Sequence, residues 1–461
     1  MKKLIAALSC LVAVAAFGAT RESPPPPGEP REFKLPAKET LRLDNGLAVT
    51  FIDYGSVPKV TILAVVRTGN IDEGESTWLP DVAVEMLKEG TTTRSAPDIA
   101  HAAAGMGGEL GVSVAAEQTT AGISVLSDQA VGAVELLADV LRNPRFPESE
   151  LPRVIANFER SLAVARSDPQ SLADEALARL VFGEHPFGRM LPREGQLAGY
   201  DIAKLRGFFE RNFGAKRTHV YVAGRYDRAT LEAAIRDAFG SWREGDPPTV
   251  LPARASETLR LELVDSPGAP QSSVRIAVPV PDPSHALYFP TTLMNSLLGG
   301  TFGSRITTNI REDKGYSYSP GSSISARRRG ALWILSAEVT AEHTAAAITE
   351  VFREIERLQR EVPPTAELEP VKAYRSGLFV ISNSSPNGVL GQLAFMNLHG
   401  LPDDFLTHWV ANIHAVTPEQ VSAMAKQFIR PERMTVVVAG DLAKIGESVR
   451  RLPQFERAAM P

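Results

Sequence analysis

The chain has 461 residues, of which 44% are hydrophobic and 22% are charged, proportions typical of a globular protein that buries a substantial core. Its formal net charge is −5, and no DNA- or RNA-binding motif is present, so the sequence gives no reason to expect a nucleic-acid partner. The single cysteine, Cys10, excludes a disulfide framework and a metal site built from several thiolates.

The first 19 residues have the pattern of a secretory signal peptide. Two lysines are followed by an apolar run over residues 4–17 and by the small residues Gly18 and Ala19. Cys10 also allows a lipoprotein signal, but the apolar run continues well past it, which disfavours that alternative. No later stretch reaches the roughly 18 apolar residues that a membrane span needs. We therefore expect an exported, periplasmic and soluble chain without a membrane span.

Residues 20–36 are rich in proline, which predicts an extended lead-in. Residues 41–53 then predict a β-hairpin that turns at Asp44, Asn45 and Gly46, followed by a strand over residues 60–67.

The sequence contains an internal repeat. HVYVAG, ending at Gly224, recurs as TVVVAG, ending at Gly440, and the segments around Pro152 and Pro169 recur around Pro370 and Pro386 at nearly the same separation. Asp201 and Thr417 are each expected to cap the helix that precedes the repeated strand. A separation that stays nearly constant over so long a span indicates two homologous halves.

We place the halves at residues 37–243 and 256–461, joined by a linker at residues 244–255 whose proline and glycine content suits a connection. Each half alternates short strands with amphipathic helices, such as residues 341–360, whose apolar positions fall on one face. The predicted fold class is therefore α+β, with two homologous halves that form a clamshell-like subunit.

Residues 297–318, LLGGTFGSRITTNIREDKGYSY, combine a glycine-rich entry, a short helical run and a glycine stop at Gly315. Tyr316, Ser317 and Tyr318 have the alternation of a strand, so Arg311 at the helix end and Tyr318 in the strand are expected to face one space. An Arg fork and a Tyr hydroxyl can together bind the carbonyl oxygens of an extended peptide. On spacing alone, a surface Arg and a half-buried strand Tyr are the simpler explanation of the pair.

The chain resembles the pitrilysin/insulinase family of zinc peptidases, which includes mitochondrial processing peptidase. The segments that carry the resemblance are RTGNIDEG (67–74), EMLKEGT (85–91), GGELGVSVAAEQT (107–119), FGEHPFGR (182–189) and the whole of residues 297–318. In this family the last segment supplies an Arg and a Tyr that bind the substrate backbone, which implies that role for Arg311 and Tyr318.

The family's zinc motif, H-x-x-E-H, is not kept in this chain. Alignment on EMLKEGT places Asp81 and Glu85 at the two His positions and Val84 at the general base, and the distant Glu ligand falls near Ser161. None of the eight histidines has a second histidine four residues away. Asp81, Glu85 and Glu159 could form a site of oxygen ligands for Ca²⁺ or Mg²⁺, but a solvated helix face is the simpler interpretation. We expect no metal and no catalytic residue in this chain.

Bacterial members of the family often occur as two dissimilar exported subunits, one with the zinc motif and one with only the Arg/Tyr pair. The resemblance implies that this chain is the second kind, inactive alone, with zinc in a homologous partner and peptides as substrates. The strand near residues 112–115 is expected to offer an edge for an extended peptide. The alternatives are a non-enzymatic scaffold and a peptide-binding protein without a peptidase partner.

Overall fold

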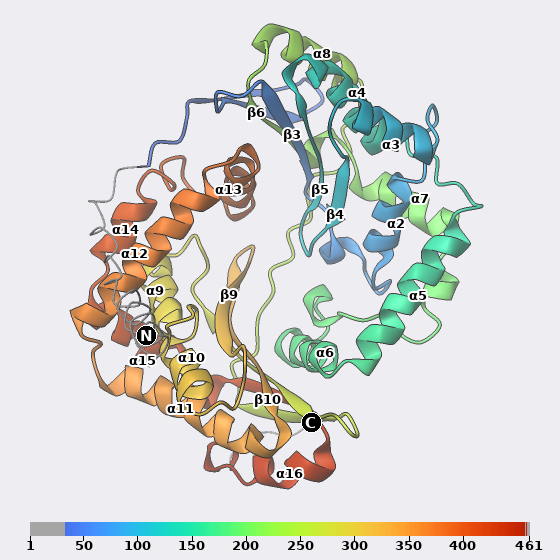
Figure 1. Cartoon of the computed structure of the whole chain (residues 1–461). Helices are drawn as coiled ribbons and strands as arrows, with labels where there is room; N and C mark the ends of the chain where they lie inside the picture. Colours follow the sequence, from blue (N-terminus) through green and yellow to red (C-terminus); the bar gives the residue numbers. More distant parts are fainter. Residues whose placement is uncertain (1–32, 457, 459–461) are drawn as a thin grey trace, which may run out of the picture. The chain divides into compact units, whose positions relative to one another are not determined.

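The computed structural model describes residues 33–456 and residue 458, which form one compact unit. Two β-sheets organise this unit (Figure 1). The six strands of the first sheet are β1 (Lys38–Arg42), β2 (Ala48–Asp53), β3 (Lys59–Val66), β4 (Gly111–Val114), β5 (Thr119–Leu126) and β6 (Thr218–Gly224). The five strands of the second are β7 (Arg260–Asp265), β8 (Gln271–Val280), β9 (Gly321–Arg327), β10 (Gly330–Thr340) and β11 (Thr435–Gly440). The predicted signal peptide and most of the predicted lead-in lie outside the described residues.

The two sheets have the same topology, as the internal repeat predicts. Their strand orders are β1-β2-β6-β3-β5-β4 and β7-β11-β8-β10-β9, so the second sheet repeats the first without β1. The repeated VAG strands, β6 and β11, each pair in parallel with one neighbour and antiparallel with the other. Asp201 and Thr417 accept hydrogen bonds from the third residue of the following helix, as predicted. The α+β fold with two homologous halves is confirmed.

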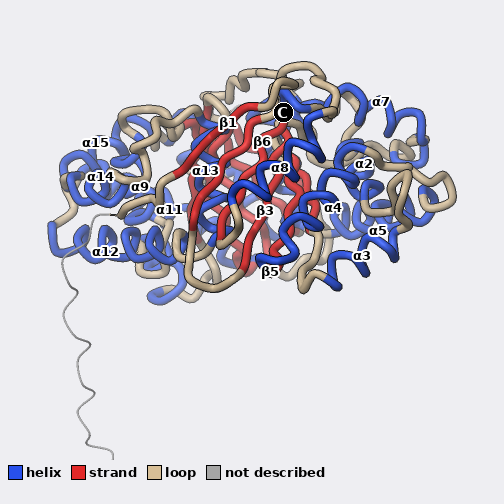
Figure 2. Tube along the Cα trace, turned by 90° about the horizontal axis from the view of Figure 1, so that it is seen from above, coloured by secondary structure: helices blue, strands red, loops and turns tan. Residues whose placement is uncertain are grey.

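Helices cover the sheets. Those of the first half are α2 (Leu79–Leu87), α3 (Ala96–Gly105), α4 (Ala130–Arg142), α5 (Leu151–Ser167), α6 (Pro169–Phe182), α7 (Ile202–Asn212) and α8 (Arg228–Gly240). Those of the second half are α9 (Tyr288–Leu298), α10 (Arg305–Thr307), α11 (Thr344–Arg360), α12 (Thr365–Ser382), α13 (Pro386–His399), α14 (Trp409–Ala415), α15 (Pro418–Phe428) and α16 (Leu442–Arg450). Figure 2 shows α3, α4, α5 and α7 grouped on one side of the strands, and α9, α11, α12, α14 and α15 on the other. Among the described helices, none is both long and apolar enough to cross a lipid bilayer.

One helix of each half packs on the sheet of the other half. Helix α6 packs on β8 and β11 of the second sheet, where Leu177 and Leu180 join Leu332 and Val437 in a small apolar cluster. Helix α13 packs in turn on β3 and β6 of the first sheet. Sequence periodicity predicts both helices, but it does not show that each covers the sheet of the other half.

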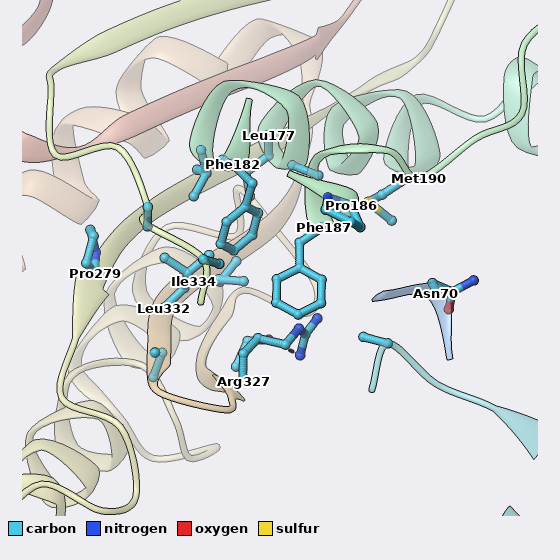
Figure 3. Close-up of a pocket in the computed structure, with 18 of the residues that line it drawn as sticks. Asn70, Leu177, Phe182, Pro186, Phe187, Met190, Pro279, Arg327, Leu332 and Ile334 are labelled. Atoms are coloured by element: carbon cyan, nitrogen blue, oxygen red, sulfur yellow. Dashed lines mark hydrogen bonds between the residues drawn. The ribbon is translucent and has the colours of Figure 1, made fainter. Parts of the chain in front are cut away.

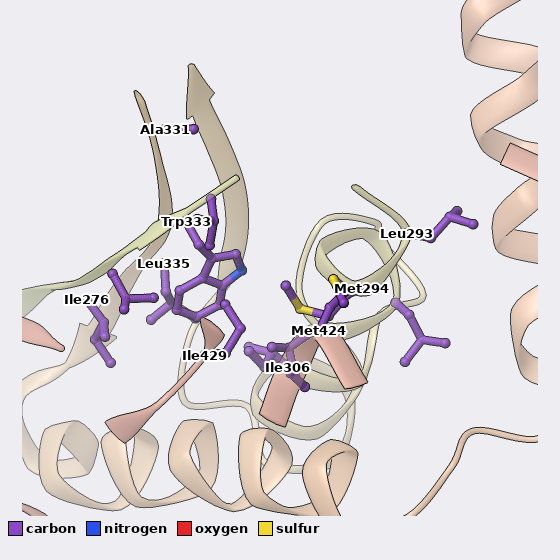
Figure 4. Close-up of a cluster of buried hydrophobic side chains, with 14 of the residues drawn as sticks. Ile276, Leu293, Met294, Ile306, Ala331, Trp333, Leu335, Met424 and Ile429 are labelled. Atoms are coloured by element: carbon purple, nitrogen blue, oxygen red, sulfur yellow. The ribbon is translucent and has the colours of Figure 1, made fainter. Parts of the chain in front are cut away.

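Trp333 lies at the centre of the second half's core and is fully buried. Figure 4 shows its indole ring beside Leu335 and Ile276 of the sheet, with Ile306 of α10 and Met294 of α9 nearby. The core therefore extends from the sheet to the helices that flank the Arg311 segment. Burial of this apolar surface holds the two ends of the segment 299–320 in place.

A buried arginine ties α6 to the second sheet. Arg275 on β8 is 4% exposed, and its guanidinium contacts Asp174 of α6 at 2.6 Å and Glu338 of β10 at 2.8 Å. These carboxylates raise the pKa of Arg275 against the opposing effect of its burial. The two ion pairs offset the free-energy cost of burying this cation.

We expect Arg275→Ala to lower the free energy of unfolding by about 2 kcal/mol, because it leaves the Asp174 and Glu338 carboxylates without their cation. Urea denaturation followed by circular dichroism measures the change. Arg353→Ala is the control, since that side chain is 71% exposed and its loss should cost less than about 0.5 kcal/mol. Equal stabilities of the two variants would show that the buried pairs contribute nothing.

Candidate functional site

Two close backbone approaches shape the glycine-rich entry that follows α9. A Cβ on Gly299 would lie 2.5 Å from Ser322 Oγ, and one on Gly300 would lie 2.5 Å from Asn295 Nδ2. The Ser322 N–H donates to Gly299 O at 2.8 Å, and Ser322 Oγ donates to Asn295 Oδ1 at 2.8 Å. A larger residue at either position would displace Ser322 or Asn295, whose contacts with the glycines join the start of β9 to the end of α9.

The helical run after the glycines is a short α-helix, α10, followed by a π-helical turn at Thr308–Asp313. Arg305 of α10 forms a bidentate ion pair with Glu367 of α12, at 2.7 and 2.8 Å. Asn309 Nδ2 donates to Glu350 and Glu354 of α11 at 2.9 and 2.8 Å. These bonds hold the turn that carries Arg311, and π-helical turns are frequent at functional sites.

The structure brings Arg311 and Tyr318 together, although not through a strand. The expectation of a strand over residues 316–318 is wrong, because Ser317 forms only an isolated bridge to Val339 and β9 begins at Gly321. Pro320 has no N–H to give to a ladder, which explains the late start of the strand. Gly315 has the positive φ of 66° expected of a helix stop, and it directs the chain back towards Arg311.

The Arg311 guanidinium lies between two aromatic rings, 4.5 Å from the ring centre of Phe302 and 4.5 Å from that of Tyr318. Both rings are largely exposed, at 65% and 77%, and Arg311 Nε contacts Glu312 at 3.0 Å. This role of Phe302 was not predicted from the sequence. The one feature that could have pointed to it is that a large apolar residue stands inside a glycine-rich turn.

A cleft of about 460 Å³ opens beside this stack. Its lining includes the backbone of the glycine entry, the side chains of Phe302 and Arg311, Ser323 at the start of β9, and Tyr374 of α12. A planar guanidinium held between rings presents its N–H donors in a fixed direction. This arrangement can bind carbonyl or carboxylate oxygens of a ligand in the cleft.

The positions aligned with the lost zinc motif lie on α2 and α5. Asp81 accepts a hydrogen bond from Asn70 Nδ2 at 2.8 Å, and burial raises its pKa. Val84 is 3% exposed in the core, and Glu85 pairs with Lys88 at 2.7 Å. Ser161 is exposed and donates its hydroxyl to the backbone of its own helix.

These residues do not fit zinc, which takes His, Cys or carboxylate ligands in a tetrahedron. At the three ligand positions, Asp81 is engaged by Asn70, Glu85 is paired with Lys88, and Ser161 has no carboxylate, while Val84 supplies no general base. Within residues 33–456, no three His, Cys, Asp or Glu side chains lie close enough together to hold a metal ion. The oxygen site considered for Asp81, Glu85 and Glu159 is therefore not assembled, and Glu159 instead borders a separate small hollow on α5.

Beside Asp81 lies a buried carboxyl group that the sequence did not single out. Glu73 is 4% exposed, and its Oε2 accepts hydrogen bonds from Trp78 N at 3.0 Å and Asn70 Nδ2 at 3.2 Å. Burial is the main cause that raises the pKa of Glu73 to about 7. An acidic residue in the RTGNIDEG segment was the only available signal.

We expect Glu73 to make stability depend on pH. Its folded pKa of about 7 lies above the ordinary value of 4.5, so the free energy of unfolding should fall as the pH rises from 4.5 to 7. Glu73→Gln should flatten that fall and stabilise the chain at pH 8 by about 2 kcal/mol. Urea titrations from pH 5 to 8 test this, with the exposed Glu75→Gln as control. Identical pH slopes in wild type and Glu73→Gln would contradict the assignment.

The duplicated α+β fold, with Arg311 and Tyr318 beside a cleft, is that of a peptidase-like chain without the H-x-x-E-H zinc motif. The insulinase family (peptidase family M16) matches residues 57–194, and the peptidase M16 inactive domain matches residues 200–374. The chain belongs to the insulinase family, as its resemblance predicted, and it is a member that lacks the H-x-x-E-H motif.

Relatives of similar length support this assignment. An uncharacterized zinc protease of Mycobacterium tuberculosis is 29% identical over 94% of this chain and 98% of its own length. YmxG, an uncharacterized zinc protease of Bacillus subtilis, is 23% identical over 86% of this chain and 96% of its own length.

Solved structures show the same fold. A peptidase M16 inactive domain from Pseudomonas fluorescens superposes with a TM-score of 0.82 at 22% identity, covering 87% of this chain and 98% of that one. A protease from Helicobacter pylori gives a TM-score of 0.83 at 15% identity, covering 88% and 100%.

Proposed function

We propose that this chain is the non-catalytic, substrate-binding subunit of an exported, heterodimeric zinc metallopeptidase. Its partner is a homologous subunit that holds the zinc, and its substrates are peptides. Arg311 and Tyr318 bind the peptide backbone and position it for hydrolysis at the partner's site. Periplasmic export rests on the signal-like residues 1–19.

The observation that carries the proposal is the stack of Phe302, Arg311 and Tyr318. Its two rings and its cation are presented at the surface, beside a cleft, rather than used to close the core. A scaffold has no need for a half-buried, oriented guanidinium between two exposed rings. A subunit that binds developing charge on a peptide carbonyl does need one, because fixed donors stabilise such charge effectively.

The edge strand β4 supports peptide binding in the same chain. Among the strands that the structure describes, it is the last of its sheet and pairs only with β5. Its free edge can accept the backbone of an extended peptide.

Co-expression with a zinc-bearing homologue from the same organism tests the proposal. We expect the two chains to co-elute as a heterodimer in size-exclusion chromatography and to cleave peptides in a chelator-sensitive way. A chain that stays alone, or forms only a homodimer beside that partner, would favour the scaffold or the solitary peptide-binding protein.

We expect the purified chain alone to bind no stoichiometric zinc and to cleave no peptide, because Asp81, Val84 and Glu85 supply neither the ligand set nor a free general base. Metal analysis by mass spectrometry and a peptide-library assay measure both properties. Chelator-sensitive cleavage that co-purifies with the single chain would overturn the assignment of a non-catalytic subunit.

A further inference from the structure

A second and larger cavity, of about 730 Å³, adjoins the Arg311 cleft along β10, where Ile334 lines both, but it contains neither Arg311 nor Tyr318. It is enclosed by α6, the 3₁₀ turn Pro186–Gly188, the linker and strands β8 and β10, and it reaches Asn70 and Asp81 of the first half (Figure 3). The roles proposed above for the Arg/Tyr pair and for the edge of β4 assign no function to this cavity.

One part of the wall is apolar. Figure 3 shows Phe182 close to Leu332 and Ile334, with Phe187 further into the cavity. Leu332 is 6% exposed, so this part of the wall is continuous with the core. The volume and lining suit one large apolar side chain with room for its neighbours.

The rest of the wall is strongly basic. Five lining residues are arginines, namely Arg189, Arg254, Arg327, Arg328 and Arg329. In the part of the chain that the structure describes, none of the five forms a salt bridge with a carboxylate. Of the three acidic lining residues, Asp174 pairs with Arg275, Glu257 pairs with Arg433, and Asp81 accepts a hydrogen bond from Asn70. The cavity therefore has an excess of positive charge.

Arg327 shows that this charge is partly desolvated. Its guanidinium lies 5.4 Å from the ring centre of Phe187. Within residues 33–456, its Nη1 donates only to Ser325 Oγ and Ala326 O, both at 3.2 Å. Its Nε and that of Arg189 are buried without a hydrogen-bond partner among the described residues. Glu117 offsets part of the charge, and its carboxylate accepts a hydrogen bond from the Arg328 backbone at 2.9 Å. A buried cation with unused donors is stabilised by an anionic ligand.

The edge strands of both sheets end at this cavity. The turn after β4 contributes Ala116, and the end of β9 contributes Ser325 and Arg327. The β9–β10 hairpin and the β4–β5 turn meet through Arg328 and Glu117. A peptide that pairs with either edge is therefore led into the cavity, which favours a peptide over a free small anion.

We infer that this cavity is a specificity pocket for a peptide that presents an apolar side chain next to a carboxylate. The apolar side chain packs against Phe182, Phe187 and Leu332, and the carboxylate pairs with Arg327 and Arg328. The inference rests on the proposed peptide-binding function and adds the class of sequence that binds.

The test uses the purified chain and synthetic peptides that differ at one position, Leu-Glu against Leu-Lys and Gly-Glu. We expect the Leu-Glu peptide to bind about tenfold more tightly than either, and the preference over Lys to shrink at high salt. Arg327→Gln/Arg328→Gln should abolish the preference. The matched control is Arg353→Gln/Arg360→Gln, because those side chains are 71% and 77% exposed on α11.

A photo-crosslinking amino acid in place of Leu locates the bound peptide. We expect crosslinks to the segment that contains Phe182 and Phe187. If the double variant does not fold, Arg254→Gln provides a second variant, since Arg254 is exposed on the linker and its loss should still reduce the preference.

Equal affinity for the Glu and Lys peptides, crosslinks elsewhere, or no binding at about 1 mM peptide would each overturn the inference. The proposed function is tested separately by Arg311 variants in the assembled complex. If the Glu and Lys peptides bind equally well but activity depends on Arg311, only the assignment of the pocket is wrong. If the Glu peptide binds more tightly but activity does not depend on Arg311, only the role assigned to Arg311 is wrong.

Discussion

Arg311→Ala, introduced into the assembled zinc-bearing complex, should lower kcat/KM by about 10²- to 10³-fold while zinc content and assembly stay unchanged. The guanidinium is held between Phe302 and Tyr318 at 4.5 Å from each ring, so its donors are oriented before the peptide binds. Loss of one oriented donor to developing oxyanion charge typically costs about 2.7 to 4 kcal/mol. Steady-state kinetics on a peptide substrate measure the change.

Two further variants separate the contributions of charge and geometry. Arg311→Lys keeps the charge but loses the planar fork and should recover only part of the activity. Tyr318→Phe keeps the ring that packs on Arg311 and removes only the hydroxyl, so a large loss would assign a direct contact to that hydroxyl. The exposed Arg353→Ala should change kcat/KM by no more than roughly twofold, as expected for a surface residue. If Arg311→Ala has wild-type kinetics in a folded, zinc-loaded complex, this chain does not contribute to catalysis through Arg311.

The fold was largely predictable because the two halves preserve the same hydrophobic and turn pattern. Gly224 and Gly440 end equivalent strands, and Asp201 and Thr417 cap equivalent helices. These features depend on local residue types, which sequence reasoning handles well. The packing of α6 and α13 on the opposite sheets was not predictable, because an apolar helix face does not specify which apolar surface it will cover.

The candidate site was predictable only in part, for a similar reason. The spacing of Arg311 and Tyr318, with Gly315 between them, led to their expected proximity. The strand assigned to Tyr318 was wrong because two alternating tyrosines gave too short a pattern, and Pro320 delays the start of β9 to Gly321. Phe302 and Glu73 were missed because their roles arise from contacts made only after folding.

Gly315→Val should reproduce much of the loss caused by Arg311→Ala. Gly315 has a φ of +66°, its N–H donates to Arg311 O at 3.1 Å, and the next N–H donates to Ile310 O at 2.9 Å. A Cβ here would meet no atom within 4 Å, so the cost of valine is conformational rather than a clash. A β-branched residue disfavours this left-handed backbone, and relief of the strain would move Tyr318 away from Arg311.

We expect Gly315→Val to lower kcat/KM of the assembled complex by about 10²-fold, because the Tyr318 ring would no longer hold the Arg311 fork towards the cleft. Gly315→Asn is the matched control, since asparagine tolerates positive φ and should retain most of the activity. Thermal unfolding and zinc analysis of both variants separate this effect from loss of fold. If Val and Asn have equal activity in folded complexes, the turn at Gly315 does not position the pair. In that case the stack of Phe302, Arg311 and Tyr318 would have to be held in place by the α11 and α12 contacts alone.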